Sequence, residues 1–385
     1  MTDQILDEFK KRGYIIDTKK IGEGAFASVY KAHRDYAIRI SKDGHDDYDN
    51  KKAIEHLHKR ICTNSYKLPF KNTHILCTES SEKIGDYLVE ILQAFDTDLM
   101  KYLIVEEQRN NNIIYHDKIS FYELSMLNDG VRYIKNFNEV SNSMLNTVTT
   151  LHDANLAHGD IKPSNILIKL NGNEIKDFAI SDFDTLCLGI RNIFTDIFEC
   201  ETSAETPLFS TMEMSNHHRN GKRYDINIKK RSDIYAINLV ILMMWHGYIK
   251  FLNIFDNNYN SDQFFDGRFK DLSKNTPEAE IKRNDFFNKL RSANERKFNN
   301  IITLHGKQLN GETIAYTTRL GYIVESFHII KNSTDILERI MSNKSIIFTS
   351  NFNQKLLQSG GYYNMKYDKY KKLYNQLKLA IKIEN

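Results

Sequence analysis

The stretch LAHGDIKPSNILI, residues 156–168, decides both the fold and the chemistry of this chain. Between two apolar runs it places Asp160, a lysine two residues on (Lys162) and an asparagine five residues on (Asn165). This arrangement suits transfer of a phosphoryl group to a hydroxyl. A carboxylate can orient the hydroxyl and accept its proton, while an ammonium group neutralises phosphate charge. We therefore expect Asp160 and Lys162 to be catalytic and Asn165 to ligate a metal ion.

A second carboxylate, Asp182 in AISDFDTL, follows Asp160 by twenty-two residues and is flanked by strand-like apolar residues. Mg²⁺ favours one or two such oxygen ligands together with the phosphates of a nucleotide. A single H-x-D is a weak signal, since most buried His–Asp pairs are structural, but the complete run at this spacing is specific. The sequence thus predicts a site for Mg²⁺, with Mn²⁺ as an alternative ion, at Asn165 and Asp182.

Composition argues against several classes of protein. With 385 residues and a net charge of +3, nothing in the chain as a whole points to nucleic acid or a membrane surface. The longest apolar run, INLVILMMW from Ile237, is too short to cross a bilayer. The cysteines are scattered and predict neither a disulfide framework nor a zinc site. This fits a reducing cytosol, that of the host if the source is an intracellular pathogen. They are Cys62, Cys77, Cys187 and Cys200.

The order of patterns along the chain predicts an α+β fold, with a small β-rich lobe followed by a larger helical lobe. Residues 14–40 alternate as a hairpin and a third strand, residues 50–61 have helical spacing, and YLVEIL at 87–92 is typical of a buried strand. Residues 141–152 and 233–245 are expected to form long helices, the second of them central.

These patterns divide the chain into three parts. A segment at 1–13 precedes a domain at 14–305, and a helical extension follows at 306–385. Within the domain we expect lobes at about 14–92 and 93–305 and an insertion at about 103–133. The last helix of the extension, YDKYKKLYNQLKLAIKI, is basic and amphipathic. It is a candidate contact for a partner or a lipid surface, although packing on its own domain is the simpler interpretation.

With these motifs in place, the chain resembles the eukaryotic-type Ser/Thr protein kinases from about residue 16 to residue 300. IGEGAFASVYKA is similar to the glycine-rich loop that covers ATP in that family, with Ala27 at the third glycine position. The resemblance implies a two-lobed protein-kinase-like fold with ATP and Mg²⁺ as cofactors. It also implies that Ile21, Gly22, Gly24 and Val29 line the nucleotide.

The next strands carry the remaining nucleotide positions of the resemblance. YAIRI aligns with the family's A-x-K strand, which places Ala37 against the nucleotide and Arg39 at the lysine position, with Glu55 as the expected ion-pair partner of Arg39. YLVEILQAF resembles the hinge. Val89 would then guard the back pocket, and Glu90 and Leu92 would offer backbone groups to adenine. Asp98 is the candidate for the ribose.

Further downstream the resemblance bears on substrate class. ETPLFSTME at 205–213 is similar to the end of an activation segment, and Glu213 is expected to pair with a buried Arg296 as a structural contact. Asp233, at the start of the helix in RSDIYAINLVILMMW, would cap that helix and hold the catalytic-loop backbone. Small-molecule kinases generally lack this segment, so a protein substrate is favoured. The K-P-S-N context of Lys162 favours Ser/Thr hydroxyls.

Two departures from the family pattern leave alternatives open. Gly159 replaces the arginine of H-R-D that reads a phosphate on the activation loop, which predicts a segment that orders itself without phosphorylation. Arg39 keeps the positive charge of the usual lysine but has a larger, planar head. Three interpretations follow: an active Ser/Thr protein kinase, a pseudokinase acting as a scaffold, or a small-molecule kinase. The complete set of Asp160, Lys162, Asn165 and Asp182 favours the first.

Overall fold

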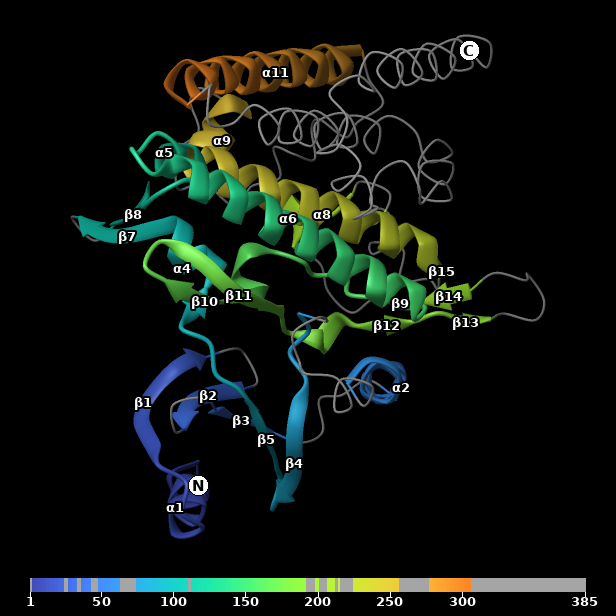
Figure 1. Cartoon of the computed structure of the whole chain (residues 1–385). Coiled ribbons are helices and arrows are strands. Elements are labelled where there is room, and N and C mark those ends of the chain that lie inside the picture. The colour runs from blue at the N-terminus through green and yellow to red at the C-terminus, as the bar shows by residue number, and fades with distance from the viewer. Residues whose placement is uncertain are drawn as a thin grey trace, which may run out of the picture.

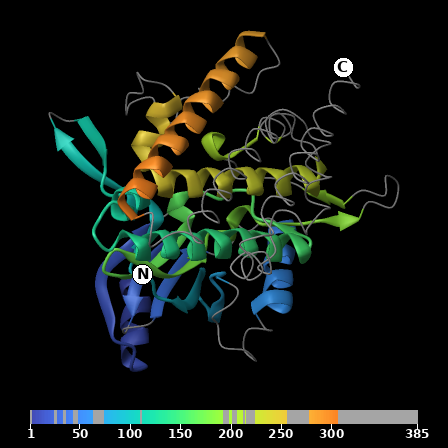
Figure 2. The same ribbon diagram turned by 45° about the horizontal axis from the view of Figure 1, so that its top comes forward.

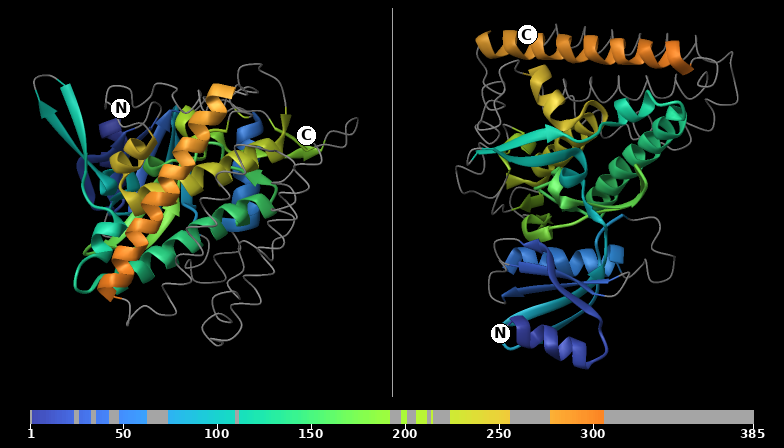
Figure 3. Two further views of the ribbon diagram at one scale, coloured as in Figure 1. Left: turned by 90° about the horizontal axis from the view of Figure 1, so that it is seen from above. Right: turned by 90° about the vertical axis from the view of Figure 1, so that its left-hand side faces the viewer.

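The computed structural model of the protein has two lobes arranged one above the other (Figure 1). The structure describes residues 2–23, 27–32, 36–42, 48–62, 74–109, 112–191, 198–200, 206–211, 214, 224–255 and 277–305. The predicted extension at 306–385, including its basic helix, lies outside these residues. A small sheet with few helices makes one lobe and a mostly helical body makes the other, as the sequence predicted (Figures 1 and 3).

The small lobe is built on one antiparallel five-stranded sheet with the order β1-β2-β3-β5-β4. Its β-branched and aromatic residues alternate with polar ones, which suits a pleated surface with one buried face. The strands are β1 (Ile16–Glu23), β2 (Ala27–Ala32), β3 (Tyr36–Lys42), β4 (Thr78–Ile84) and β5 (Tyr87–Gln93).

The two faces of this sheet have different partners. Ile38, Ile40 and Val89 lie on the face covered by helix α1 (Thr2–Lys11) and form one core with its Ile5, Leu6 and Phe9. Residues two apart in a strand share a face, so Ala37 and Arg39 lie on the opposite face. Strand β5 places Leu92 opposite Ala37 and Glu90 opposite Arg39. The 1–13 segment therefore packs as part of the small lobe.

Helix α2 (Tyr48–Leu57) continues into a short π-helical turn, η1 (His58–Cys62). Cys62 at its end is joined to Cys77, just before β4, with their Cα atoms 5.7 Å apart. A second disulfide joins Cys187 to Cys200, with Cα atoms 6.0 Å apart. Both separations fall within the usual range for a disulfide. The expectation of unpaired cysteines was wrong, because the fold brings together residues that show no paired spacing in the sequence. The cysteine pattern therefore no longer supports a reducing compartment.

The predicted insertion at 103–133 forms regular structure. A hairpin of β7 (Ile104–Arg109) and β8 (Asn112–Asp117) projects from the body (Figures 1 and 2). It is preceded by β6 (Thr97–Asp98) and α4 (Leu99–Leu103) and followed by α5 (Phe121–Ser125). At the base of the hairpin, Asp117 accepts hydrogen bonds from the backbone N–H groups of Ile249 (2.8 Å) and Lys250 (2.9 Å). The insertion is thereby fixed to the large lobe.

Two long helices form the centre of the large lobe. In α8 (Ile226–His246) the residues from Arg231 to His246 are all buried, and α6 (Gly130–Asp153) lies along it (Figure 1). Phe137 packs on Trp245 with ring centroids 5.2 Å apart. Helix α9 (Tyr248–Phe255) and the long α11 (Pro277–His305) complete the top of the lobe. No helix among the described residues is long and apolar enough to span a bilayer.

Short strands and turns connect this helical core to the small lobe. Strands β10 and β11 pair antiparallel with each other, and β10 also pairs with β6. Strand β12 pairs with β9, while β14 lies between β13 and β15. The elements are β9 (Leu156–Ala157), η3 (Pro163–Asn165), β10 (Ile166–Asn171), β11 (Glu174–Ile180), η4 (Phe183–Thr185), β12 (Cys187–Leu188), β13 (Ile190–Arg191), β14 (Phe198–Cys200), η5 (Pro207–Phe209) and β15 (Tyr224–Asp225).

We predict that Phe9→Ala destabilises the small lobe by about 3–5 kcal/mol, the usual cost of truncating a buried aromatic side chain. Phe9 is 1% exposed, whereas Lys11 on the same helix is exposed. Lys11→Ala is therefore the matched control and should change the free energy of unfolding by less than about 0.5 kcal/mol. Urea unfolding measures both. Equal stability of the two variants would show that α1 is not part of the small-lobe core.

Candidate active site

The catalytic loop lies between β9 and β10, at the edge of the large lobe that faces the small sheet. The two-residue strand β9 leads into His158 and Gly159, and the loop ends in the 3₁₀ turn η3, which contains Asn165. The Asn165 amide nitrogen donates to the backbone carbonyl of Asp160 at 2.8 Å and to its Oδ2 at 3.3 Å. The loop is thereby closed on itself, which fixes the position of the Asp160 carboxylate.

The Asp160 carboxylate is held from two further sides. Lys162 Nζ donates to Oδ2 at 2.6 Å, and Thr206 Oγ1 donates to Oδ1 at 2.6 Å. Lys162 Nζ also lies 3.3 Å from Thr206 Oγ1. The Asp160 side chain is 12% exposed, so it is accessible yet constrained. The structure thus brings together the two residues predicted to be catalytic and adds Thr206. In the sequence, Thr206 was only one residue of the ETPLFSTME stretch that resembles the end of an activation segment.

A buried carboxylate supports the loop from below. Asp233 is fully buried in α8 and accepts hydrogen bonds from the backbone N–H groups of His158 (2.8 Å) and Gly159 (2.7 Å). His152 Nε2 donates to it at 3.0 Å. Burial alone would raise the pKa of Asp233, but these partners outweigh burial and hold the pKa below its ordinary value. Asp233 therefore holds the loop backbone as predicted. It does not cap the helix, since α8 begins at Ile226 and Asp225 is its N-cap.

The predicted metal ligands lie on adjacent chain segments. Ser181, the residue before Asp182, donates its backbone N–H to the Asn165 carbonyl at 2.9 Å. Asp182 is exposed and has a left-handed backbone, φ 64° and ψ 72°. The Asn165 amide nitrogen donates to Asp160, and coordination of a cation by its amide oxygen stays a prediction. One amide oxygen and one open carboxylate are the ligand types that Mg²⁺ takes from proteins.

Arg39 occupies the face of β3 that looks toward this site. Its Nη1 donates to Glu90 Oε2 at 2.7 Å and its Nη2 to Asp184 Oδ1 at 3.3 Å. Burial would lower the pKa of Arg39, but the carboxylates of Glu90 and Asp184 raise it above the ordinary value. Thr78 Oγ1 in turn donates to Glu90 Oε1 at 3.0 Å. The forked guanidinium therefore links β5 to the start of the activation segment.

Glu55 was the wrong choice of partner for Arg39. It is exposed on α2, and Arg39 forms its ion pairs with Glu90 and Asp184. Helical spacing alone did not reveal which side of α2 faces the sheet. His58, in the η1 turn that continues α2, interacts electrostatically with Glu90. Burial lowers the pKa of His58, and the Glu90 carboxylate opposes that effect. The missing signal was in the strands: Arg39 and Glu90 sit opposite each other in the β3–β5 register.

The hinge assignment also needs correction. Glu90 and Leu92 are inside β5, which is paired with β3 on one side and β4 on the other at both positions. The sheet takes up the backbone groups there, so they are not available to adenine. Val89 faces the α1 core and is 1% exposed, so it does not guard the back pocket. Leu92, which lies opposite Ala37 in the β3–β5 register, becomes the candidate for that place. The link between β5 and β6 at 94–96 becomes the candidate hinge.

The remaining nucleotide positions are placed as follows. Ile21 in β1 is 41% exposed, and Gly22 lies against Val29 of β2, since a Cβ added at Gly22 would lie 3.6 Å from the Val29 Cβ. Contact of these three residues with a nucleotide stays a prediction. Gly24 lies outside the described residues. Asp98 caps α4, accepting from the Lys101 N–H at 2.8 Å and pairing with its ammonium at 2.9 Å. Contact of Asp98 with a ribose stays a prediction.

The predicted structural pair at the end of the activation segment is not supported. Arg296 is exposed on α11, whereas we expected it to be buried. Glu213 lies outside the described residues. Helix α11 runs as one long helix across the top of the large lobe (Figure 3).

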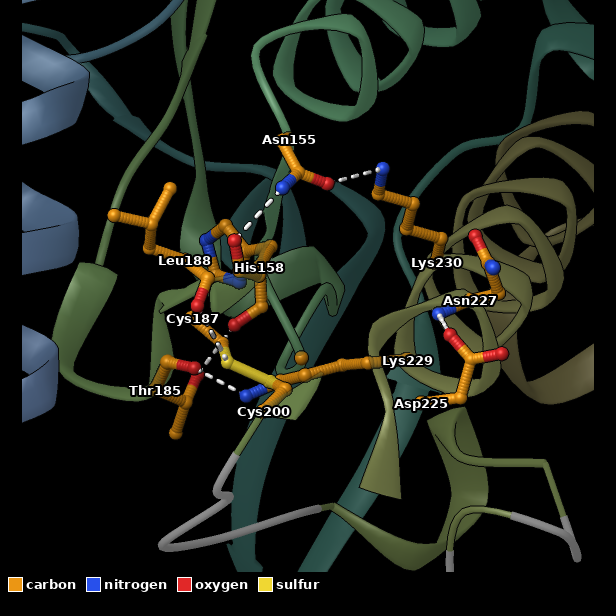
Figure 4. The surroundings of a disulfide bond; sticks show 12 residues. Asn155, His158, Thr185, Cys187, Leu188, Cys200, Asp225, Asn227, Lys229 and Lys230 are labelled. Carbon is orange, nitrogen blue, oxygen red and sulfur yellow. Dashed lines mark hydrogen bonds between the residues drawn. A yellow bond between two sulfur atoms is a disulfide. The ribbon is translucent and has the colours of Figure 1, made fainter. Parts of the chain in front are cut away.

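The disulfide Cys187–Cys200 links two parts of the activation segment (Figure 4). Cys187 belongs to β12, which pairs with β9 beside the catalytic loop, and Cys200 ends β14. Next to it, Thr185 Oγ1 donates to the His158 carbonyl at 2.8 Å, and Asn155 donates to the Gly189 carbonyl at 2.8 Å. Covalent and hydrogen-bonded links therefore both tie this part of the segment to the large lobe.

Comparison with known proteins identifies the class to which this fold and site belong. The family model described as protein kinase domain matches residues 15–303, and the chain belongs to that family. Among curated proteins it is similar to the probable serine/threonine-protein kinase fhkA of Dictyostelium discoideum, 28% identical over 219 residues that cover 56% of this chain and 32% of the relative.

Two vertebrate relatives have similar levels of identity. The MAP kinase-interacting serine/threonine-protein kinase 1 of Xenopus tropicalis is 23% identical over 62% of this chain and 51% of the relative. The testis-specific serine/threonine-protein kinase 5 of Mus musculus is 22% identical over 63% of this chain and 62% of the relative. The matches thus span between about a third and three fifths of these relatives.

The Arg39–Glu90 pair generates a prediction that separates the two candidate partners. Glu90→Gln removes a charge-assisted hydrogen bond, worth about 1.5–3 kcal/mol, and should lower kcat/KM for ATP by roughly 10- to 100-fold. Glu55→Gln, the matched change on α2, should alter kcat/KM by less than about twofold, because an exposed charge contributes little. Steady-state phosphotransfer assays measure both. A larger loss from the Glu55 variant would restore the arrangement first expected from the sequence.

Proposed function

We propose that the protein transfers the γ-phosphate of ATP, with Mg²⁺, to serine and threonine hydroxyls of a protein substrate. The observation that carries the proposal is the Asp160 carboxylate, fixed by Lys162, Thr206 and Asn165 at the edge of the large lobe. A carboxylate in this setting can orient an incoming hydroxyl and accept its proton.

Each residue of the site has its own role in the proposed reaction. Asp160 receives the proton of the substrate hydroxyl, and the neighbouring Lys162 ammonium supplies positive charge beside the phosphate being transferred. Asn165 and Asp182 are the residues that would hold Mg²⁺, whose chemistry is to neutralise charge gathered on the phosphates. Asp233 keeps the loop carrying Asp160 from moving, so the carboxylate need not reorganise during the reaction.

A Ser/Thr substrate in a protein is the finer part of the proposal. Residues 206–211 lie beside the catalytic loop, and Thr206 contacts both Asp160 and Lys162. This places the segment that resembles a peptide platform next to the proposed base. The three relatives described above are all named as serine/threonine kinases. The small net charge gives no reason to propose nucleic acid as a partner.

A pseudokinase is the second candidate, and one observation favours it. Arg39, at the position where the family has its phosphate-binding lysine, is already paired with two carboxylates, Glu90 and Asp184. A guanidinium neutralised in this way has less charge to offer a nucleotide. The complete set of residues around Asp160 still favours catalysis, because a scaffold has no chemical need for a positioned carboxylate and a neighbouring ammonium.

A cytoplasmic site of action is also part of the proposal, since the reaction draws on ATP. It requires the disulfides Cys62–Cys77 and Cys187–Cys200 to persist against a reducing thiol pool. The basic stretch at 367–383 remains a candidate contact for a partner or a lipid surface.

We expect Asp160→Asn to lower kcat by roughly 100- to 10,000-fold, the usual contribution of a positioned general base. Affinity for ATP should stay within about threefold, because Asp160 meets the hydroxyl substrate and not the nucleotide. Asp153→Asn, an exposed aspartate at the end of α6, is the control. Transfer of ³²P from ATP and calorimetric titration give the two numbers. More than a tenth of wild-type turnover in the Asp160 variant would refute its role as base.

Asp182→Ala should abolish the effect of Mg²⁺ on ATP binding together with activity, since the remaining protein ligand, Asn165, is neutral. Titration of wild type and variant with ATP, with and without Mg²⁺, measures this directly. A variant in which Mg²⁺ still strengthens ATP binding as it does in wild type would exclude Asp182 as the ligand.

A further inference from the structure

Helix α8 carries a lysine whose charge is completely buried. Lys229 is 0% exposed and lies one helical turn before Asp233. Lysine is rarely buried to this degree unless its ammonium group has partners. Its Nζ donates to the backbone carbonyl of Thr185, at the end of η4 (Figure 4). The lysine therefore reaches from the central helix of the large lobe to the start of the activation segment.

The space for this side chain exists because residue 159 is glycine. Gly159 has φ +84°, and a Cβ built on it would lie 1.9 Å from Lys229 Cε and 2.6 Å from its Nζ. A side chain at this position would therefore meet both backbone strain and the lysine. Gly159 and Lys229 are complementary: the first leaves a gap in the catalytic loop, and the second fills it.

Thr185 completes a short chain of contacts around this gap. Its backbone carbonyl accepts from Lys229, and its hydroxyl donates to the His158 carbonyl at 2.8 Å. His158 Nε2 donates in turn to the Ser181 carbonyl at 3.0 Å. These bonds join the residues on both sides of Asp182 to the residues just before Asp160. The proposed metal ligand and the proposed base are thus held relative to each other.

Two carboxylates near Lys229 favour its charged form. Burial lowers the pKa of Lys229 to about 8, while the carboxylates of Asp233 and Asp160 oppose that effect. Asp233, which holds the His158 and Gly159 backbone, therefore favours the charged form of Lys229. In the relatives that the sequence resembles, an arginine at the position of Gly159 meets a phosphate. Here a cation reaches the same region from α8.

We propose that Lys229 is a positioning residue that fastens the start of the activation segment to the catalytic loop from inside the large lobe. It holds Asp160 and Asp182 in register without any phosphate on the segment. This inference rests on the proposed function for its kinetic consequence, but the contact itself has a separate physical signature.

The first test compares Lys229→Met with Lys230→Met. Lys230 is the next residue of α8, and its Nζ donates to the His152 carbonyl at 2.9 Å and to Asn155 Oδ1 at 3.2 Å, away from Thr185. Loss of a charge-assisted hydrogen bond predicts a kcat about 10- to 100-fold lower for the Lys229 variant, with KM for ATP within about twofold. The Lys230 variant should keep kcat within about twofold of wild type. Equal kcat values in the two variants, measured per folded molecule, would overturn the proposal.

The second test uses the complementarity of Gly159 and Lys229. Gly159→Ala strains the backbone in any background, but it displaces the lysine only when the lysine is present. In a cycle with Lys229→Ala, the loss of kcat from Gly159→Ala should be roughly tenfold smaller in the Lys229→Ala background than in wild type. The same loss in both backgrounds would show that the glycine does not serve to accommodate the lysine.

Amide hydrogen exchange separates this inference from the proposed function. Peptides covering 183–188 should exchange faster in Lys229→Met than in wild type or Lys230→Met, whether or not phosphate is transferred. If wild type transfers no phosphate and this difference is present, the proposed function fails and the lysine contact stands. Unchanged exchange in this region overturns the contact. If Lys229→Met does not fold, Lys229→Gln, whose side chain is polar but shorter and uncharged, serves in the same comparison with the same expected direction.

Discussion

The buried carboxylate of Asp233 is the constraint on which the site depends. Placing an anion at the centre of a helical lobe is costly unless it is paired and hydrogen-bonded. Here His158, Gly159 and His152 supply the donors. The first two donors are backbone groups of the catalytic loop, so the hydrogen bonds that stabilise the buried anion also fix the conformation of the loop. The position of the Asp160 carboxylate therefore depends on Asp233, a residue that no substrate contacts.

The two departures from the family pattern share one physical logic, in which a charge is supplied by a different element. At Arg39 the partner carboxylate comes from β5 (Glu90) instead of from the exposed Glu55 on α2. At Gly159 the missing cation is supplied by Lys229 from α8. Strand β5 and helix α8 are central elements, fixed by pairing or packing on both sides. In both places the partner therefore comes from a central element of the fold.

The sequence was most informative where the chemistry itself requires a spacing. The catalytic run at 156–168 and the later Asp182 follow from what phosphoryl transfer demands, and the alternating residues at 14–40 became β1, β2 and β3. Side-chain direction was harder to predict. The choice of Glu55 failed because helical spacing shows that a face exists but not what it faces.

Long-range contacts were not visible from the sequence. The hinge was placed too early because the end of β5 at Gln93 is set by pairing with two other strands. Arg296 was expected to be buried because of a motif resemblance, which does not show which side of α11 the residue occupies, and it is exposed. Both disulfides, and the contact of Lys229 with Thr185, join residues far apart in the chain. No local pattern could have indicated these contacts. The glycine at position 159, where the family has an arginine, did indicate that another side chain occupies the space of that arginine.

If the site is held from within the large lobe, phosphate on the activation segment is unnecessary. The most direct measurement is the turnover of protein treated with a phosphatase and shown by intact mass to carry no phosphate. Its kcat should equal that of the untreated protein, since Lys229 and the Cys187–Cys200 disulfide already fasten the segment. A kcat that falls by an order of magnitude or more, and returns when a site mapped within residues 183–212 is phosphorylated, would contradict this.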